Sequence, residues 1–352
     1  MAGIYISYPF CSQKCTYCNF ASGVFPKDLE ARYREALLRE IRAHVWEWTP
    51  DTVYLGGGTP SLIDPTFLLN ELPGKPWLEA TIEAAPGTLN IEGWRAAGLN
   101  RVSLGVQSFV TAELRRTGRR HTAETVEHDV AMLRAGGFDN INIDLIAGLP
   151  LQTATSWNES LDWIERLNPP HVSVYMFEVD EDSTLGAEII LGGKRYSATD
   201  TPSEDATAEM YETAVARLKT MGIERYEISN FARPGFESVH NLKYWQLAPY
   251  IGFGSDAHSF DGHKRWQNAE SAQAYVEGAP REYSDANADE KFFVGLRLMG
   301  GVRPDAAEWQ RYEAPIRRFV DGGFMETGGG LLRLTARGVM VSNDIFQEFL
   351  TA

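Results

Sequence analysis

The feature that most constrains the fold of this chain is a repeated alternation of short apolar runs with longer amphipathic stretches. The short runs are rich in β-branched residues, whereas the stretches between them have helical periodicity, as in Leu29–Trp48, Thr122–Ala135 and Ala154–Leu167. Buried strands joined by helices are typical of a parallel sheet, so the pattern predicts an α/β barrel or an open α/β sheet. The predicted strands are Ile4–Ser7, Val53–Leu55, Ala80–Glu83, Arg101–Gly105, Asn140–Ile146 and His171–Phe177.

Cysteines, glycines and polar residues recur where the predicted strands end. Cys11 follows the first strand, and the segment Gly56–Pro60, with sequence GGGTP, follows the second. In either α/β architecture the functional loops lie at the carboxyl ends of the parallel strands. We therefore expect one site at this edge of the sheet, built from the cysteines, the glycines, Glu83, Gln107, Asp144 and Glu178.

The charge and the amino-terminal segment limit the class of protein. A net charge of -15 argues against a general binder of nucleic acid or of anionic membranes. It leaves room for a local basic site, and the motif LRRTGRRH gathers Arg115, Arg116, Arg119, Arg120 and His121. No apolar run approaches the length of a membrane span, and MAGIYISYPF has no signal-peptide pattern. We expect a cytoplasmic protein.

The chain contains only three cysteines, spaced as Cys11-x3-Cys15-x2-Cys18. An odd, clustered set does not resemble a disulfide framework in a chain without a signal peptide. Thiolates bind zinc or iron–sulfur centres, but a structural zinc usually has four ligands and the nearest histidine is His44. We favour a cubane cluster with one open iron over zinc with a distant ligand or three inert buried thiols.

The pattern changes after about residue 201. A predicted helix at Glu204–Met221 precedes a loop-rich, aromatic stretch at Tyr226–Trp266. The part from Asp289 to Leu350 is predicted to be helical, apart from one short hairpin at Leu331–Thr335 that follows a turn at glycines 328–330. We place a domain boundary near residue 230.

Seven segments in a fixed order resemble one family. The segments are YISYPFCSQKCTYCNF, YLGGGTPSL, TIEAAPGTL, RVSLGVQSF, NINIDLIAGLPLQT, YEISNFA and HNLKYW. Within the first, CSQKCTYC is similar to the CxxxCxxC signature of the radical S-adenosylmethionine (SAM) superfamily. The whole set resembles the oxygen-independent coproporphyrinogen III oxidase family, most closely its HemW (heme chaperone) branch. The resemblance implies a partial (β/α)6 radical SAM barrel in residues 1–230, open on one side, and a small, mostly helical C-terminal domain in residues 231–352.

The resemblance also implies roles for single residues. Cys11, Cys15 and Cys18 would hold a [4Fe-4S] cluster whose open iron chelates SAM. The reduced cluster would pass one electron to the sulfonium, which releases methionine and a 5′-deoxyadenosyl radical. The glycines would let the backbone approach the amino-acid part of SAM. The residues implied to contact this SAM are Tyr5, Tyr17, Gly57, Gly58, Thr59 and Glu83.

A second SAM surrounds four matching positions in the coproporphyrinogen enzyme, at Gln107, Arg119, Asp144 and Glu178, although that enzyme has a small residue in place of Glu178. Taken without the family, several residues have plainer interpretations. The three glycines fit an ordinary turn, Glu83 fits a solvated carboxylate at a strand end, and Arg119 fits a solvated charge on a helix face.

Two departures separate the chain from the coproporphyrinogen enzyme. Phe20 stands where that enzyme has a further cysteine, and the first strand begins near Ile4 without that enzyme's long N-terminal extension. Both favour a chaperone that binds the cluster, SAM and heme and transfers heme to an acceptor protein. The alternative is an oxygen-independent coproporphyrinogen III oxidase (dehydrogenase), which decarboxylates propionates to vinyls in porphyrin biosynthesis. A relative of heme-degrading radical SAM methyltransferases is a third interpretation.

The HNLKYW motif supplies the heme candidates His240, Tyr244 and Trp245. A neutral imidazole suits heme iron, and the aromatic rings suit a porphyrin face. The equally weighted alternative is a histidine that fixes a loop while the rings fill a core. The expected partners are heme or a porphyrin, a heme acceptor protein, including one at the membrane periphery, and an electron donor such as flavodoxin or ferredoxin. SAM cleavage is possible in principle, so enzymatic activity is left open.

Overall fold

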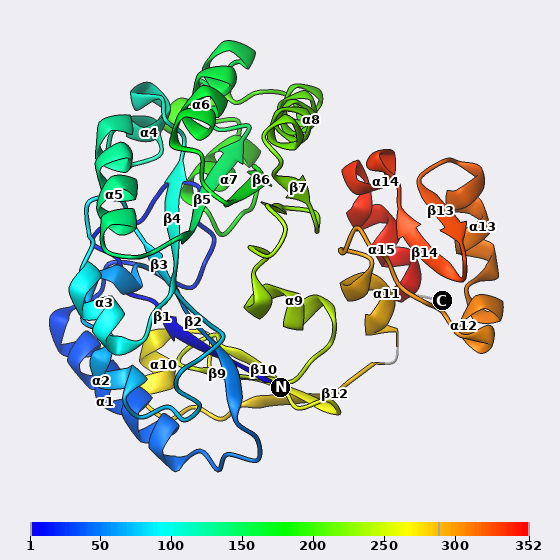
Figure 1. Ribbon diagram of the computed structural model, residues 1–352. Helices are drawn as coiled ribbons and strands as arrows, with labels where there is room; N and C mark the ends of the chain where they lie inside the picture. The colour runs from blue at the N-terminus through cyan, green and yellow to red at the C-terminus, as the bar shows by residue number, and fades with distance from the viewer. Residues whose placement is uncertain (1, 288, 351–352) are drawn as a thin grey trace.

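A computed structural model describes residues 2–287 and 289–350 of the chain. Its centre is a set of six parallel strands that lie side by side in sequence order, with helices along their outer face (Figure 1). The fold is therefore the predicted α/β class with a partial barrel. These strands are β1 (Ala2–Tyr8), β2 (Pro50–Gly57), β3 (Glu79–Ala84), β4 (Arg101–Gln107), β5 (Asn140–Ala147) and β6 (His171–Met176).

The sheet continues beyond both ends of this set, and in the described residues its two edge strands, β12 (Glu282–Asp285) and β7 (Glu224–Arg225), are not paired with each other. On one side β9 (Tyr250–Phe253) pairs in parallel with β1, and on the other β8 (Asn230–Ala232) pairs antiparallel with β6. The edges are completed by β10 (His258–Phe260), β11 (Lys264–Gln267) and β12 beside β9, and by β7 beside β8.

The outer face of the parallel strands is apolar and the inner face is polar. In β5, for example, Ile141 and Ile143 are fully buried outward-facing residues, and they alternate with Asn142 and Asp144. The core therefore lies between the sheet and its outer helices. The helices from α1 to α8 are α1 (Lys27–Ala43), α2 (Thr66–Leu69), α3 (Ile91–Ala97), α4 (Thr111–Arg116), α5 (Ala123–Ala135), α6 (Ala154–Leu167), α7 (Thr184–Ile190) and α8 (Glu204–Thr220).

The start of α5 agrees with the sequence pattern, whereas the end of α1 does not. Thr122 is the N-cap of α5, and Thr125 takes the place of the usual capping-box glutamate by bonding back to the Thr122 backbone at 3.3 Å. The helix predicted at Leu29–Trp48 ends at Ala43 instead. The His44 ring packs at 4.6 Å from Trp46 and at 5.4 Å from Phe253 of β9, so contact with a distant strand ends this helix early.

The stretch Tyr226–Trp266 alternates loops with a short helix and short strands that the sequence did not predict. It contains β8, β9, β10, β11 and the helix α9 (Val239–Trp245). These elements are short, and β9 is stabilised by pairing with β1, which lies about 250 residues earlier in the chain at Gly3↔Tyr250. Pairing over such a distance leaves no local pattern in the sequence.

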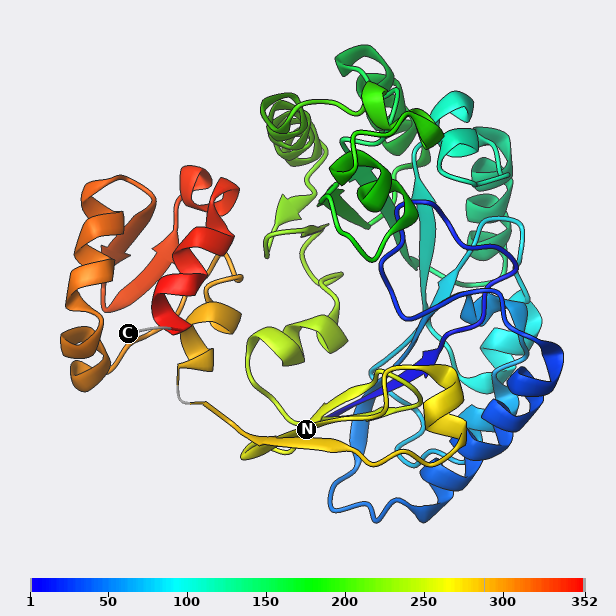
Figure 2. The same cartoon turned by 180° about the vertical axis from the view of Figure 1, so that it is seen from behind.

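The last part of the chain forms a small unit of helices around one hairpin, β13 (Met325–Gly328) and β14 (Leu331–Leu334). The predicted glycine turn joins these two strands, although the sequence pattern missed β13. The unit lies across the open side of the sheet, beyond α9, in both views (Figures 1 and 2). Its helices are α11 (Glu290–Gly295), α12 (Ala306–Arg311), α13 (Glu313–Asp321), α14 (Ala336–Met340) and α15 (Ser342–Leu350). The preceding helix, α10 (Ala272–Val276), packs instead against α1.

The domain boundary near residue 230 stays a prediction. Strands β9 to β12 follow that position in the sequence but belong to the same sheet as β1 to β6. The C-terminal unit meets the rest of the chain through the Met299 N–H, which donates to the Tyr226 carbonyl at 3.0 Å, and through Arg297, which lies 4.6 Å above the Trp245 ring.

None of the described helices combines the length and the apolarity needed to span a bilayer.

Candidate functional site

The three cysteines lie in the loop between β1 and α1, at the carboxyl edge of the parallel sheet. Backbone hydrogen bonds hold this cysteine loop (residues 11–23) closed, because the Cys11 N–H donates to the Gly23 carbonyl at 2.8 Å. The loop is also attached to its neighbours. The Thr16 N–H donates to the Thr117 carbonyl at 3.2 Å, and the Thr16 carbonyl accepts from the Leu185 N–H at 2.7 Å. All three thiols are free and partly exposed.

The surroundings of the cysteines fit an iron–sulfur cluster. Arg119 Nη1 lies 3.4 Å from Cys15 Sγ and 3.3 Å from the Tyr17 hydroxyl, so a cation lies beside one of the three sulfurs. In the described parts of the chain, no three His, Cys, Asp or Glu side chains converge on one metal ion. A cubane requires no such convergence, because each of its thiolates binds a different iron.

The glycine segment after β2 packs directly on the chain that leads into the cysteine loop. The Gly58 N–H donates to the Tyr8 carbonyl at 2.8 Å, and the Thr59 N–H donates to the Phe10 carbonyl at 3.0 Å. A Cβ atom on Gly58 would lie 2.7 Å from the Pro9 carbonyl carbon. The close approach expected of this glycine is therefore an approach to backbone of the protein itself. It sets the path by which β1 enters the cysteine loop.

Glu83 projects from β3 onto the inner face beside this segment. Its carboxylate accepts from the Tyr54 hydroxyl at 3.0 Å and from the Gly57 N–H at 3.2 Å. Burial, together with the nearby charge of Asp144, raises the pKa of Glu83 to about 7. The ring of Tyr5 on β1 stacks 6.2 Å from that of Tyr54. Tyr5, Gly57 and Glu83 are thus brought together as expected.

A second group of predicted residues meets the cysteine loop at the end of β4. An Arg119 Nη2–H donates to the Gly105 carbonyl. Gln107 has the unusual φ of 72°, and its Oε1 atom is buried without a hydrogen-bond partner among the described residues, as is Arg119 Nε. Buried polar atoms are nearly always paired, so these two atoms fit a polar ligand at this edge. Strained residues of this kind also concentrate at functional sites.

Asp144 lies on β5 at the boundary between two halves of the inner face. Its carboxylate accepts from Asn142 Nδ2 at 2.7 Å and from the Ser103 hydroxyl at 3.2 Å, and burial raises its pKa. Inward-facing residues nearer the carboxyl ends of the strands, including Tyr5, Tyr54, Glu83, Gln107 and Asp144, are partly accessible. Those nearer the amino ends, including Thr52, Glu79, Arg101, Asn142 and His171, are buried.

A buried polar network that was not anticipated from the sequence supports Asp144. Asn142 also donates to the Ser103 hydroxyl at 2.7 Å, and its Oδ1 atom lies 2.6 Å from His171 Nδ1. The other ring nitrogen of His171 lies 2.9 Å from the Tyr226 hydroxyl. The signal was present in NINID and HVSVY, where polar residues occupy every second position. A strand buried between two apolar layers lacks that alternation.

The heme candidates lie at the opposite end of the strands from the cysteines. His240 is on α9 and is 1% exposed. Its Nδ1 atom lies 2.9 Å from Thr52 Oγ1 and its Nε2 atom 2.8 Å from the Tyr244 hydroxyl. Burial lowers the pKa of His240 to about 3, with a further contribution from Lys243. The ring is therefore neutral, and neither nitrogen is free for iron in this arrangement.

The other residues of the HNLKYW helix, α9, also pack at the amino ends of the parallel strands. The Glu79 carboxylate accepts from the N–H groups of Val239 and His240 at 2.9 and 3.0 Å, which places an anion at the start of α9. The Tyr244 ring packs edge-on at 4.6 Å from Tyr250. Trp245 carries Arg297 above its ring. This geometry matches the alternative in which the motif holds the fold.

Phe20 and Glu178, the two positions at which the resemblance implies a departure from the coproporphyrinogen enzyme, are exposed. Phe20 follows the third cysteine by two positions and is 66% exposed. Glu178 lies past β6 and is exposed, without a hydrogen bond or ion pair that reaches the other site residues in the described ranges.

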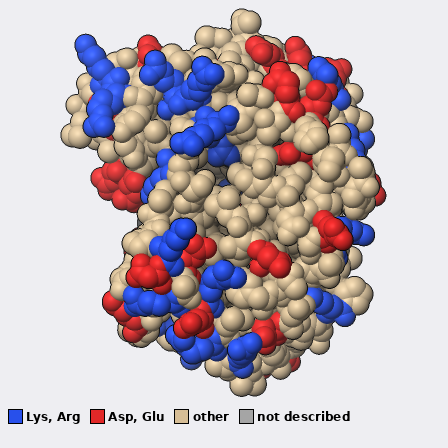
Figure 3. All heavy atoms as spheres, turned by 90° about the vertical axis from the view of Figure 1, so that its left-hand side faces the viewer, with Lys and Arg blue, Asp and Glu red and all other residues tan. Residues whose placement is uncertain are grey.

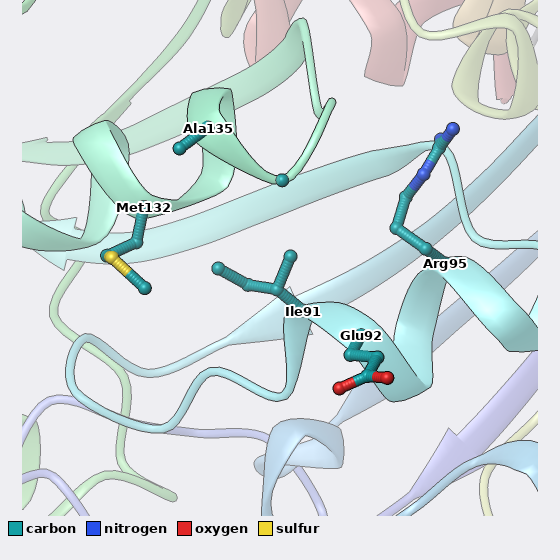
Figure 4. A pocket seen from close by; sticks show the side chains of 6 residues that line it. Ile91, Glu92, Arg95, Met132 and Ala135 are labelled. Carbon is teal, nitrogen blue, oxygen red and sulfur yellow. The ribbon is translucent and has the colours of Figure 1, made fainter.

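One hollow on the protein surface lies away from these residues. It measures about 510 Å³ and lies between α3 and α5 on the outer side of the sheet, where Ile91, Met132 and Ala135 line it (Figure 4). None of the predicted site residues lines this hollow. The candidate site is instead the inner, carboxyl-end half of the sheet together with the cysteine loop.

Comparisons with known proteins identify the family of the chain. A family model described as the radical SAM superfamily matches residues 5–164. The heme chaperone HemW of Lactococcus lactis is 33% identical over 98% of this chain and 96% of its own length. The heme chaperone HemW of Bacillus subtilis is 32% identical over 99% of both chains. That of Haemophilus influenzae is 34% identical over 99% of this chain and 97% of its own length.

Among solved structures, coproporphyrinogen III oxidase (HemN) from Escherichia coli matches with a TM-score of 0.83. It covers 99% of this chain and 90% of its own, at 23% identity. At that identity the match supports the fold of the whole chain, including the C-terminal unit, and nothing about the reaction.

Proposed function

This chain belongs to the HemW family of radical SAM proteins, and we propose that it is a heme chaperone that holds a [4Fe-4S] cluster, SAM and heme. The observation that carries the proposal is the 33% identity with the heme chaperone HemW of Lactococcus lactis over 98% of the chain. In this proposal the chain binds heme and passes it to an acceptor protein.

Cys11, Cys15 and Cys18 are proposed to hold the cluster. When bound and reduced, the cluster supplies one electron to the sulfonium of SAM. A cationic amino group of SAM beside Glu83 would favour the ionised carboxylate and offset the cost of its burial. The unpaired Gln107 Oε1 and Arg119 Nε atoms support a ligand in the same place. The proposed SAM residues are Tyr5, Tyr17, Gly57, Gly58, Thr59, Glu83, Gln107, Arg119 and Asp144.

The chaperone is preferred to the decarboxylating enzyme because the likeness to coproporphyrinogen III oxidase extends to the fold alone. Phe20 supports the same preference, since it places an exposed apolar ring where that enzyme is expected to have a cysteine. For heme itself, we propose that the iron takes its protein ligand outside the HNLKYW helix. Both ring nitrogens of His240 already have partners.

The test combines heme binding with turnover. Anaerobically reconstituted protein is titrated with heme, and the Soret band is followed to saturation. The same protein is then incubated with coproporphyrinogen III, SAM and reductant, and the tetrapyrroles are separated and quantified. We expect saturable heme binding and no decarboxylated product. Several equivalents of product per chain, or the failure to bind heme, would overturn the proposal.

A further inference from the structure

Three exposed arginines form a basic patch beside the cysteine loop. This arginine patch consists of Arg115 and Arg116, in the last turn of α4, and Arg120, in the loop before α5. Among the ion pairs of the described residues, none includes these three guanidinium groups. The side of the molecule that carries α4 and α5 shows Lys and Arg side chains gathered in its upper left part (Figure 3).

The patch is joined to the cysteine loop by direct contacts. The Thr117 carbonyl, one residue after Arg116, accepts from the Thr16 N–H at 3.2 Å. A Cβ atom on Gly118 would lie 3.9 Å from the Cys15 Cα atom. Arg119 then reaches inward to Cys15 Sγ at 3.4 Å. The short segment 115–120 therefore carries the exposed positive charges and also contacts a sulfur of the proposed cluster.

We propose that the arginine patch is the docking surface for an acidic one-electron donor protein of the flavodoxin or ferredoxin class. The inference rests on the proposed function, because it requires a cluster on the three cysteines. In the step concerned, the donor loses one electron and the cluster gains it, with no bond made or broken. Lys14 within the loop is also exposed and adds a positive charge beside this surface, since its carbonyl would lie 3.8 Å from a Cβ atom on Gly118.

The charge balance of the chain supports an acidic partner. A protein with a net charge of -15 repels another acidic protein at most of its surface. An unpaired group of cations reverses that repulsion locally and orients the encounter. Redox partners typically use small interfaces, so a few charges have a large influence on the association rate.

The experiment uses the reconstituted full chain, the variant R115E/R116E/R120E and a control variant with the same charge change, R32E/K219E/K264E. The control residues are exposed and lie on α1, α8 and β11, outside the patch. Binding of oxidised flavodoxin is measured by interferometry at several ionic strengths. Cluster reduction by reduced flavodoxin is followed by stopped-flow bleaching, and reduction by photoreduced deazaflavin, a small neutral reagent, is followed in parallel.

At low salt we expect the patch variant to bind flavodoxin about tenfold more weakly than the wild type does. We also expect flavodoxin to reduce the variant's cluster about tenfold more slowly. Added salt should remove most of that difference, since screening acts within about 10 Å at 0.1 M. The control variant and the deazaflavin rates should match the wild type. Wild-type binding and rates in the patch variant would overturn the docking surface, as would equal losses with deazaflavin. A wild-type chain that assembles no reducible cluster would instead overturn the proposed function.

Discussion

The Nδ1 atom of His240 lies 2.9 Å from the Oγ1 atom of Thr52, at the end of the strands remote from the cysteines. This contact ties α9 to the start of β2, and the bond from His240 to Tyr244 lies within α9. We expect His240→Ala to lower the free energy of unfolding by about 3 kcal/mol, through a cavity and two hydroxyl groups that lose a buried partner. Denaturant unfolding of the apo chain measures this.

The same variant separates the two roles considered for His240. If the residue holds the fold, the Soret band of the heme complex stays at its wild-type position in His240→Ala. Tyr283→Ala, at an exposed site on β12, serves as a control for stability and spectrum. A shifted Soret band together with near-normal stability would identify His240 as a heme ligand and contradict our assignment.

Glu83 should give the protein a measurable pH dependence. Its pKa is raised from 4.5 to about 7, so its contribution to stability is fully present below pH 4.5 and is lost as the pH rises through 7. Glu83→Gln mimics the protonated form and removes this loss. We expect wild type and variant to unfold at similar denaturant concentrations near pH 4, and the wild type to be less stable by about 3 kcal/mol near pH 8.5. Parallel pH profiles would contradict the assignment.

Gly58 should matter for the cluster as well as for SAM. A side chain there meets the Pro9 and Phe10 backbone, which leads directly to Cys11. We expect Gly58→Val to reduce the iron content after anaerobic reconstitution by at least half, in addition to weakening SAM binding measured by calorimetry. Gly328→Val is the matched control, because nothing lies within 4 Å of its added Cβ atom. Full iron content with weakened SAM binding would mean that only the ligand site is affected.

Each cysteine should be required for the cluster. Replacing Cys11, Cys15 or Cys18 by Ala leaves two thiolates, and we expect reconstituted variants to lose the about four irons that a [4Fe-4S] cluster contains. Ser12→Ala, at an exposed position in the same loop, should keep them. A single-cysteine variant with full iron and an unchanged response of its spectrum to SAM would rule out the three-ligand assignment.

Much of the fold was predictable because its signals are local. The six parallel strands follow from apolar runs, and α5 and α6 end at the predicted Ala135 and Leu167. The start of α5 was visible in Thr122, although its partner Thr125 is an unusual capping residue. Elements that depend on distant partners were missed, as β9 and α9 show. Their stability comes from β1 and from Glu79, which no local pattern connects to them.

The cysteine spacing and the ordered motifs determined the family of this protein and the cofactor expected at its cysteines, because short loops keep their ligands close together whatever the rest of the chain does. Only the tertiary structure decided what surrounds each side chain. It placed His240 between Thr52 and Tyr244, and it placed the backbone of Pro9 against Gly58. It also brought Arg119 to Cys15 across a separation of 104 residues. A hydrogen-bond partner or a neighbouring charge depends on where distant segments meet, and that is decided when the sheet assembles.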